Sequence, residues 1–242
     1  MNLKNYMVSK SDICSILESS FVDEGFDSFV FREKDKGLHG LKEVRFDNSG
    51  SYLVFSSEIF KKSRDIYKKR FSAIHLKKDC DQVVLFEKNN KTYICWIEVK
   101  TSLHEIYKKG IFQIPGCYYK IKLILNQFNF YSNDNVIEYA LAIYADDAPV
   151  FAATDAIQRN DNYMRLKTSK ISAPPMTLEQ KIERKYSRML CSCSKGMLDG
   201  KDFDMHKMPI RSEYIMDKLP FIIWPVSYRG AVVDMDKIIA LL

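Results

Sequence analysis

Two apolar segments separated by a pair of asparagines limit the folds open to this chain more than any other part of it. Residues 81–88 (DQVVLFEK) and 91–100 (KTYICWIEVK) flank Asn89-Asn90, a dipeptide that favours the turn of a β-hairpin. Both segments are apolar on successive positions, so the pattern predicts two strands that are buried on both faces. We therefore expect this hairpin at the centre of a sheet that is covered on each side.

A turn centred on Asn89-Asn90 also determines which residues face each other. Opposed residues then have numbers that sum to 179, which places Asp81 opposite Glu98 with Cβ atoms about 5 Å apart. Side chains alternate between faces along a strand, so Lys100 points the same way as Glu98. The face of Asp81 and Glu98 otherwise carries Val83, Leu85, Ile94 and Trp96, and the opposite face carries Val84, Phe86, Cys95, Ile97 and Val99.

Two carboxylates at the end of a buried strand pair need a compensating charge, since like charges repel and burial raises their cost. A hard divalent cation supplies that charge, and carboxylate oxygens suit Mg²⁺, with Mn²⁺ as an alternative. An ammonium beside the metal, from Lys100, orients or activates an attacking water and stabilises charge on a phosphate. Asp81, Glu98 and Lys100 therefore predict metal-assisted phosphodiester hydrolysis.

This arrangement resembles the catalytic hairpin of the PD-(D/E)XK nucleases, the restriction-endonuclease-like superfamily. In that family an acidic residue opens one strand, and an apolar-Glu-apolar-Lys sequence follows on the next strand. The matching residues here are Asp81 and Trp96-Ile-Glu98-Val-Lys100. Cys80 stands where the family usually has a proline, a departure that many divergent members share.

The family often has two further site residues, in the helices on either side of the hairpin. A glutamine in the following helix is matched by Gln113, and an acidic residue in the preceding helix is best matched by Glu58. Asp65 and Glu18 are alternatives for that acid. The resemblance thus implies Asp81, Glu98 and Glu58 as metal ligands, with Gln113 at the site.

The resemblance covers residues 55–145 and implies an α/β fold, in which a mixed sheet is flanked by helices in the order α-β-β-β-α-β. It suggests three segments. Residues 1–50 form an N-terminal helix and a small β element, residues 51–150 form the nuclease-like core, and residues 151–242 form an extension packed on the core. No linker separates them.

Local patterns predict the remaining elements. We expect helices at 11–21, 57–71, 103–125 (kinked or interrupted by Pro115), 177–190 (opened by a Thr177–Gln180 capping box) and 234–242. We expect strands at 29–31, 41–46, 52–55, 136–144 and 221–226, the last an edge strand because of Pro225, with a turn at 47–50 and a loop at 192–206.

The sequence allows two interpretations for several of the charged residues. Lys108, Lys109, Lys120 and Lys122 either line a phosphate-binding groove or form a solvated helix face. Lys78 and Asp79 are expected to be solvated, and Tyr118 and Tyr119 are expected to lie in the core, with stacking on bases as the alternative. The pair Glu98 and Lys100 has an alternative reading as a charge pair on a solvent-exposed edge strand.

The resemblance implies a metal-dependent DNA endonuclease with a role in genome defence or restriction. A net charge of +6 permits nucleic-acid binding. One site cuts one strand, so a double-strand cut needs a homodimer or a partner. Any ATP-driven step needs a partner with ATPase activity, because no GxxxxGK[ST] loop is present. We expect a cytoplasmic protein, since no apolar run of about 18 residues and no secretory signal is present.

Two other classes of function stay open. One is a catalytically silent nuclease-fold subunit that binds or scaffolds a nucleic-acid complex. The other is an interaction protein unrelated to nucleases, in which the acidic pair is a coincidence. That reading places Asp81 and Glu98 more than about 10 Å apart, beyond the reach of one shared metal.

Overall fold

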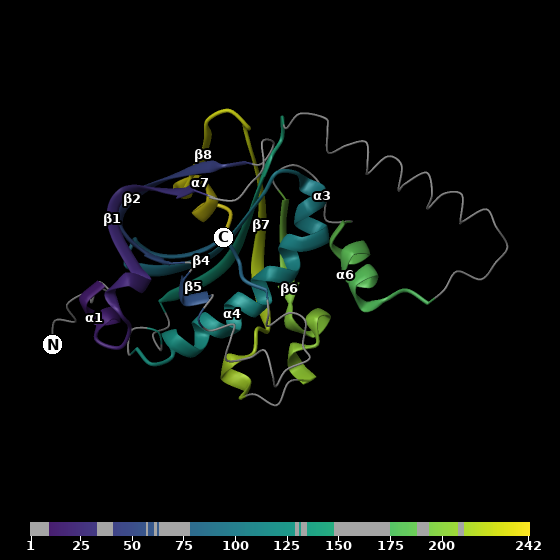
Figure 1. Ribbon diagram of the computed structural model, residues 1–242, viewed down its shortest axis with the longest axis horizontal. Helices are drawn as coiled ribbons and strands as arrows, with labels where there is room; N and C mark the ends of the chain where they lie inside the picture. The colour runs from purple at the N-terminus through teal and green to yellow at the C-terminus, as the bar shows by residue number, and fades with distance from the viewer. Residues whose placement is uncertain are drawn as a thin grey trace.

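The computed structural model describes residues 10–32, 41–56, 58–60, 62, 78–128, 131, 135–147, 175–187, 194–207 and 211–242. It shows a mixed α/β fold built on one eight-stranded sheet of order β1-β2-β3-β4-β5-β7-β6, with β8 paired to β2 (Figure 1). The strands are β1 (Val22–Arg32), β2 (Glu43–Phe55), β3 (Gln82–Lys88), β4 (Lys91–Lys100), β5 (Val136–Ala145), β6 (Ser194–Asp199), β7 (Lys218–Val226) and β8 (Ala231–Asp234).

The helices are short apart from one. They are α1 (Lys10–Cys14), α3 (Leu103–Glu105), a π turn (Ile106–Gly110), α4 (Ile111–Leu125), α6 (Leu178–Ser187) and α7 (Met235–Ile239), together with 3₁₀ turns at Ser19–Phe21, Gly200–Phe203, Met205–Lys207 and Ser212–Tyr214. No helix among these described segments is long and apolar enough to cross a membrane.

The central hairpin is confirmed in turn and register. Asn89 and Asn90 have φ of 52° and 58°, the left-handed conformation that a two-residue hairpin turn requires. Val83 pairs with Trp96 and Leu85 with Ile94, as the sum of 179 predicts. β4 has β3 on one side and β5, in parallel, on the other, so it lies inside the sheet.

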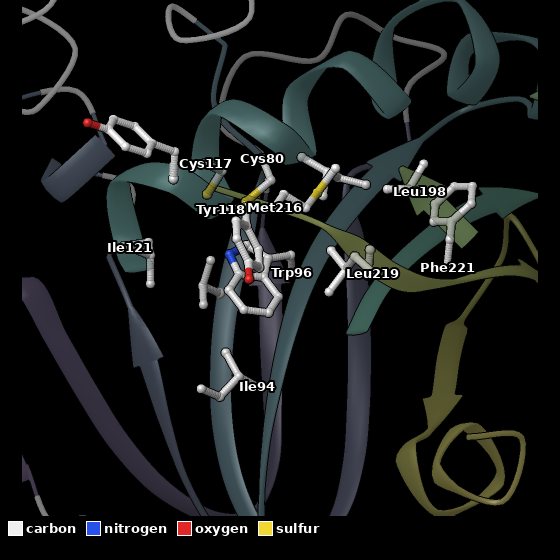
Figure 2. Packing of buried hydrophobic residues seen from close by; sticks show 14 of the residues in the cluster. Cys80, Ile94, Trp96, Cys117, Tyr118, Ile121, Leu198, Met216, Leu219 and Phe221 are labelled. Atoms are coloured by element: carbon white, nitrogen blue, oxygen red, sulfur yellow. The ribbon is translucent and has the colours of Figure 1, made fainter. Parts of the chain in front are cut away.

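The two faces of the hairpin enter two separate cores, also as expected. Val83, Leu85, Ile94 and Trp96 belong to a core that contains residues of α1, α4 and α6. Figure 2 shows part of this core, in which the Trp96 and Tyr118 rings lie 4.8 Å apart. The opposite face, with Val84, Phe86, Cys95, Ile97 and Val99, packs in a second core with residues of β1, β2, β8 and α7.

The expected turn at 47–50 is wrong, because β2 runs through it as one strand. Phe26 pairs with Ser51 and Ser28 with Asp47, so three residues of β2 lie opposite Asp27 alone. Asp27 has φ of 66°, and the irregularity is a bulge. It separates two pairings of β2, with β8 over Val44–Asp47 and with β3 over Tyr52–Phe55. A turn sequence became a bulge because β1 pairs with both of its flanks.

The C-terminal third departs furthest from expectation. The loop expected at 192–206 is wrong, since it contains β6 and two 3₁₀ turns. The sequence of β6, SKGMLD, does not alternate between apolar and polar residues, and pairing with β7 makes it a strand. β7 is not an edge strand either, because it lies between β5 and β6. Pro225 fits there because the β6 pairing ends at Ile223.

Other helix predictions hold in part. The capping box is confirmed: the Thr177 N–H donates to Gln180 Oε1 (2.9 Å) and the Gln180 N–H donates to Thr177 Oγ1 (3.2 Å). The helix expected at 11–21 is shorter, and the terminal helix is α7, preceded by the unexpected β8. The long helix is interrupted by the π turn upstream of Pro115, which lies inside α4. The helix expected at 57–71 lies outside the described residues except at 58–60 and 62.

The implied order α-β-β-β-α-β stays a prediction, because most of residues 57–77 lie outside the described residues. Between residues 58 and 103 the described segments contain two strands, β3 and β4. The third antiparallel strand of the meander is β2, which precedes residues 57–71. One sheet draws strands from all three expected segments, and β2 crosses the boundary at residue 50.

Candidate active site

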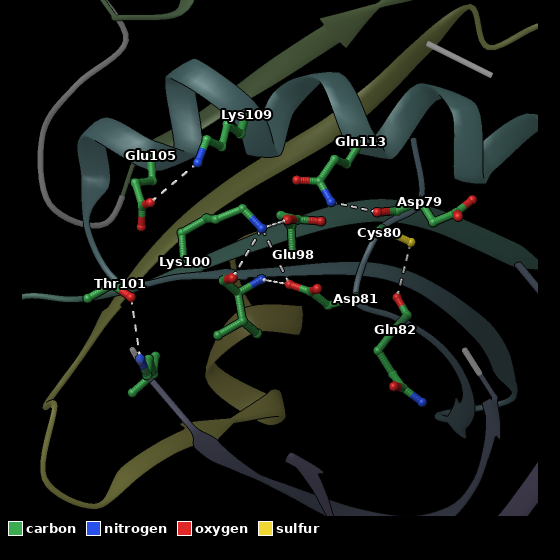
Figure 3. A network of polar contacts seen from close by, with 12 residues as sticks. Asp79, Cys80, Asp81, Gln82, Glu98, Lys100, Thr101, Glu105, Lys109 and Gln113 are labelled. Atoms are coloured by element: carbon green, nitrogen blue, oxygen red, sulfur yellow. Dashed lines mark hydrogen bonds and ion pairs between the residues drawn. The ribbon is translucent and has the colours of Figure 1, made fainter. Parts of the chain in front are cut away.

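Asp81, Glu98 and Lys100 meet where β3 begins and β4 ends. The Asp81 N–H donates to Ile97 O (3.0 Å), but Ile97 is already paired with Gln82, so the β3–β4 ladder does not extend to a direct pair of Asp81 with Glu98. The Val99 N–H donates to Asp81 Oδ2 at 2.7 Å, so the backbone of β4 orients this carboxylate (Figure 3). Glu98 comes after Ile97 in β4, and its side chain lies on the same face of the sheet as Trp96, the face covered by α4.

The Lys100 ammonium lies among three oxygens. It contacts Glu98 Oε1 directly, is 3.7 Å from Asp81 Oδ2, and donates to Val99 O at 3.4 Å (Figure 3). The side chains of Lys100, Asp81 and Glu98 are 12%, 17% and 0% exposed. A cation therefore already occupies the space between the two carboxylates and offsets their repulsion.

This geometry removes two of the alternative readings of the acidic pair. Glu98 is fully buried on a strand inside the sheet, so the exposed edge-strand reading is wrong. Asp81 and Glu98 each have an oxygen within 4.0 Å of Lys100 Nζ, so these oxygens are less than about 8 Å apart. The wide separation that a coincidental pair predicts, more than about 10 Å, is not observed.

The donor set fits a hard divalent cation. Carboxylate and carbonyl oxygens are the ligands that Mg²⁺ and Mn²⁺ prefer. Oxygens of Asp81, Glu98 and the Val99 carbonyl converge on one cationic nitrogen, that of Lys100. Two carboxylates around one ammonium leave an excess of negative charge, which suits a second, more highly charged cation.

Gly110 brings the helix close to this cluster. A Cβ atom at Gly110 would lie 3.1 Å from Glu98 Cγ and 3.8 Å from Lys100 Cγ. The helix backbone thus rests on the aliphatic parts of both site residues. Gly110 ends the π turn, and such turns often occur at functional sites. The sequence offered one signal for this residue, a glycine inside an otherwise helical pattern.

Gln113 lies beside the site but contacts the chain that leads into β3. Its Nε2 donates to Asp79 O at 2.6 Å (Figure 3). The carboxylate of Asp79 contacts the ammonium of Lys120 and is 13% exposed, so the expectation that Asp79 is solvated is wrong. A direct role for Gln113 in the chemistry stays a prediction.

The four lysines of the long helix divide into two pairs. Lys120 is 2% exposed and Lys122 donates to Tyr118 Oη (2.6 Å) and Glu138 Oε2 (3.3 Å). Both readings, groove or solvated face, are therefore wrong for these two. Lys108 and Lys109 are exposed, and Lys109 is 3.9 Å from Glu105. Tyr118 and its neighbour at 119 are buried in the core, as expected.

The upstream acid of the resemblance stays a prediction. Glu58 is exposed just after β2, and its N–H donates to Ser56 Oγ at 3.2 Å. Glu18 is 69% exposed and lies 3.5 Å from Lys62. Asp65 lies outside the described residues.

Two thiols lie immediately behind the site. Cys80 precedes Asp81, and its side chain packs beside Cys117 of α4 (Figure 2). Burial, followed by a hydrogen bond with Cys117, raises the pKa of the Cys80 thiol well above its usual value. A protonated, buried thiol is a poor nucleophile and metal ligand, so Cys80 acts here as a packing residue.

No protein-family model, no curated protein and no solved structure matches this chain. A functional assignment therefore depends on the geometry of the site.

A second group of metal-ligating side chains was not predicted. Ligand atoms of Asp199, His206 and Asp217 lie within 4.8 Å of one another. They come from the end of β6, a 3₁₀ turn and the residue before β7, so spacing in the sequence held no signal for them. His206 and Asp217 are exposed, and exposed acidic groups often approach each other without an ion. The cluster alone does not define a site.

Proposed function

We propose that this protein is a metal-dependent deoxyribonuclease that uses Asp81, Glu98 and Lys100. The observation that carries the proposal is the burial of Glu98, fully enclosed and sharing one ammonium with Asp81 at the end of a central strand pair. Buried carboxylates destabilise a fold unless they are paired or bind a cation. An arrangement this costly is typical of a site that performs chemistry.

Each residue has a distinct role in the proposed reaction. Asp81, held by the Val99 N–H, and Glu98 would hold Mg²⁺ or Mn²⁺ through their oxygens. The bound cation supplies positive charge to the scissile phosphate and makes a bound water more acidic. Lys100 has the only ammonium described beside both carboxylates, so it is placed to donate a hydrogen bond to the attacking water or to a phosphate oxygen.

The resemblance to restriction-endonuclease-like nucleases extends the proposal to the biological setting. Genome defence or restriction in the cytoplasm is the proposed role, with a homodimer or a partner protein for double-strand cutting. The fold supports this as far as a central antiparallel β2–β3–β4 meander followed by α4 and the parallel β5. Lys108 and Lys109, which are exposed and lie in the same π turn as Gly110, are available for phosphate contacts.

The test is cleavage of plasmid and linear DNA in Mg²⁺, Mn²⁺ or EDTA, combined with calorimetric titration of each metal. Glu98→Gln and Lys100→Met are compared with Glu43→Gln, which neutralises an exposed carboxylate paired with Arg32. We expect metal-dependent cutting that the first two variants lose and the third retains. Cutting that persists in both site variants would reject the site.

Metal and DNA binding without cleavage would instead favour the silent binding subunit. Silent members of the resembled family typically lose the lysine or one carboxylate, whereas Asp81, Glu98 and Lys100 are all present here, which favours activity.

A further inference from the structure

One stripe of α4 holds the three residues that lead into Asp81. Gln113, Cys117 and Lys120 are spaced four and three residues apart, so they lie on one face of the helix. Gln113 donates to Asp79 O at 2.6 Å, and Lys120 donates to Lys78 O at 3.4 Å.

Two further contacts complete this attachment. The Lys120 ammonium contacts the Asp79 carboxylate, and the side chain of Cys80 packs beside Cys117 (Figure 2). Every residue from 78 to 80 is thus attached to α4 through its backbone or side chain.

The attachment ends one residue before Asp81. From there the chain is held by β4, through the Asp81 N–H to Ile97 O and the Val99 N–H to Asp81 Oδ2. The residues just before Asp81 are therefore held by α4, and Asp81 itself is held by β4. The same helix reaches Glu98 through Gly110, so α4 contacts the surroundings of both carboxylates. α4 therefore touches both the segment that leads into Asp81 and the side chain of Glu98.

The ion pair of Lys120 with Asp79 is a poor source of stability. Lys120 is 2% exposed, and burying an ammonium costs more than a buried pair usually returns. Replacing such a pair by uncharged groups of similar volume is often neutral or stabilising. The Lys120 ammonium contacts both the Asp79 carboxylate and the Lys78 carbonyl, and an uncharged side chain at position 120 would not make these directed contacts.

We propose that Lys120 is a positioning residue for the metal site, acting through Asp79 to hold the Asp81 carboxylate at its distance from Glu98. This inference rests on the proposed function. Residues that orient metal ligands typically change metal affinity or activity by about 10- to 100-fold when they are replaced.

The experiment compares three variants with the wild-type protein. Lys120→Met removes the ammonium, and the double variant Asp79→Asn/Lys120→Met removes both charges, so that no unpaired carboxylate is left buried. Lys122→Met is the matched control, because Lys122 lies on the same helix and is paired with Glu138, away from residues 78–80. The readouts are Mn²⁺ affinity by calorimetry, kcat and KM for DNA, hydrogen exchange at the Asp81 and Val99 amides, and the unfolding temperature.

We expect the double variant to unfold near the wild-type temperature and to bind Mn²⁺ about 10- to 100-fold more weakly. Its kcat falls while KM for DNA is unchanged, and the Asp81 and Val99 amides exchange faster. The Lys122→Met control keeps wild-type Mn²⁺ affinity. If Lys120→Met alone does not fold, the double variant still decides the question.

Two results overturn the inference in distinguishable ways. Wild-type Mn²⁺ affinity and amide exchange in the double variant would reject the positioning role and leave the proposed function standing. A wild-type protein that neither binds Mn²⁺ nor cuts DNA would reject the proposed function, and the positioning role with it.

Discussion

Replacing Gly110 by alanine is expected to weaken metal binding while it leaves the stability of the fold nearly unchanged. The new methyl group would lie 3.1 Å from Glu98 Cγ, whereas carbon atoms in contact usually lie about 3.5–4.0 Å apart. Glu98 is fully buried and its carboxylate contacts Lys100, so the strain is relieved by moving Glu98 or the helix by a few tenths of an ångström.

The effects on stability nearly cancel. Gly110 has helical dihedral angles (φ −59°, ψ −49°), so alanine gains about 1 kcal/mol of helix propensity. Burying one methyl group adds about 0.8 kcal/mol, and overpacking subtracts about 1–3 kcal/mol. The free energy of unfolding is thus expected to change by no more than about 1 kcal/mol. Metal affinity is less tolerant, because Mg²⁺ requires ligand distances of about 2.0–2.1 Å in nearly ideal geometry.

The assay pairs urea unfolding with calorimetric titration of Mg²⁺ and Mn²⁺. We expect Gly110→Ala to lose about 10- to 100-fold in affinity, the range found when the support of a metal ligand is disturbed. Lys108→Ala is the control, since it changes the exposed side of the same π turn. Wild-type metal affinity in Gly110→Ala would refute the reasoning, as would a loss of stability much larger than 1 kcal/mol with affinity intact.

Three further predictions test the electrostatics and the local structure. Lys100→Met leaves two carboxylates without their shared ammonium and should cost about 3–5 kcal/mol without metal. Added Mg²⁺ should raise its unfolding temperature more than that of the wild type, and an equal rise would contradict this. Burial raises the pKa of the Cys80 and Cys95 thiols and of the Tyr118 phenol, so as the pH rises these groups ionise in the unfolded chain at a lower pH than in the folded protein. The urea midpoint should therefore fall as pH rises above the ordinary thiol pKa of 9.0, and a constant midpoint between pH 7 and 10 would count against it. Thr177→Ala should lower the free energy of unfolding, measured in urea, by about 1 kcal/mol because it removes the N-cap of α6, whereas Thr177→Ser should retain most of that stability.

The parts of the fold that could be predicted are those that depend on neighbours in the sequence. The Asn89-Asn90 turn sets the hairpin register, and alternation along each strand assigns its side chains to the two cores. The capping box of α6 likewise needs only residues three apart. For the same reason Asp81 and Glu98 could be brought together from the sequence.

The parts that could not be predicted depend on segments far apart in the chain. Asp47-Asn48-Ser49-Gly50 is a turn sequence, and only pairing of β1 with both flanks makes it a bulge within β2. The sequence at 194–199 does not alternate between apolar and polar residues, and the segment becomes a strand because it pairs with β7.

The candidate site divides in the same way between sequence and tertiary structure. By itself the sequence determined the acid, acid and lysine at one end of a hairpin, because a turn and a two-residue repeat are enough to place them. Only the tertiary structure decided that Lys120 is a buried partner of Asp79 and that Gly110 rests on Glu98. A helical pattern in the sequence indicates which residues share a face of the helix. The packing of α4 on the sheet determines which of those residues are buried.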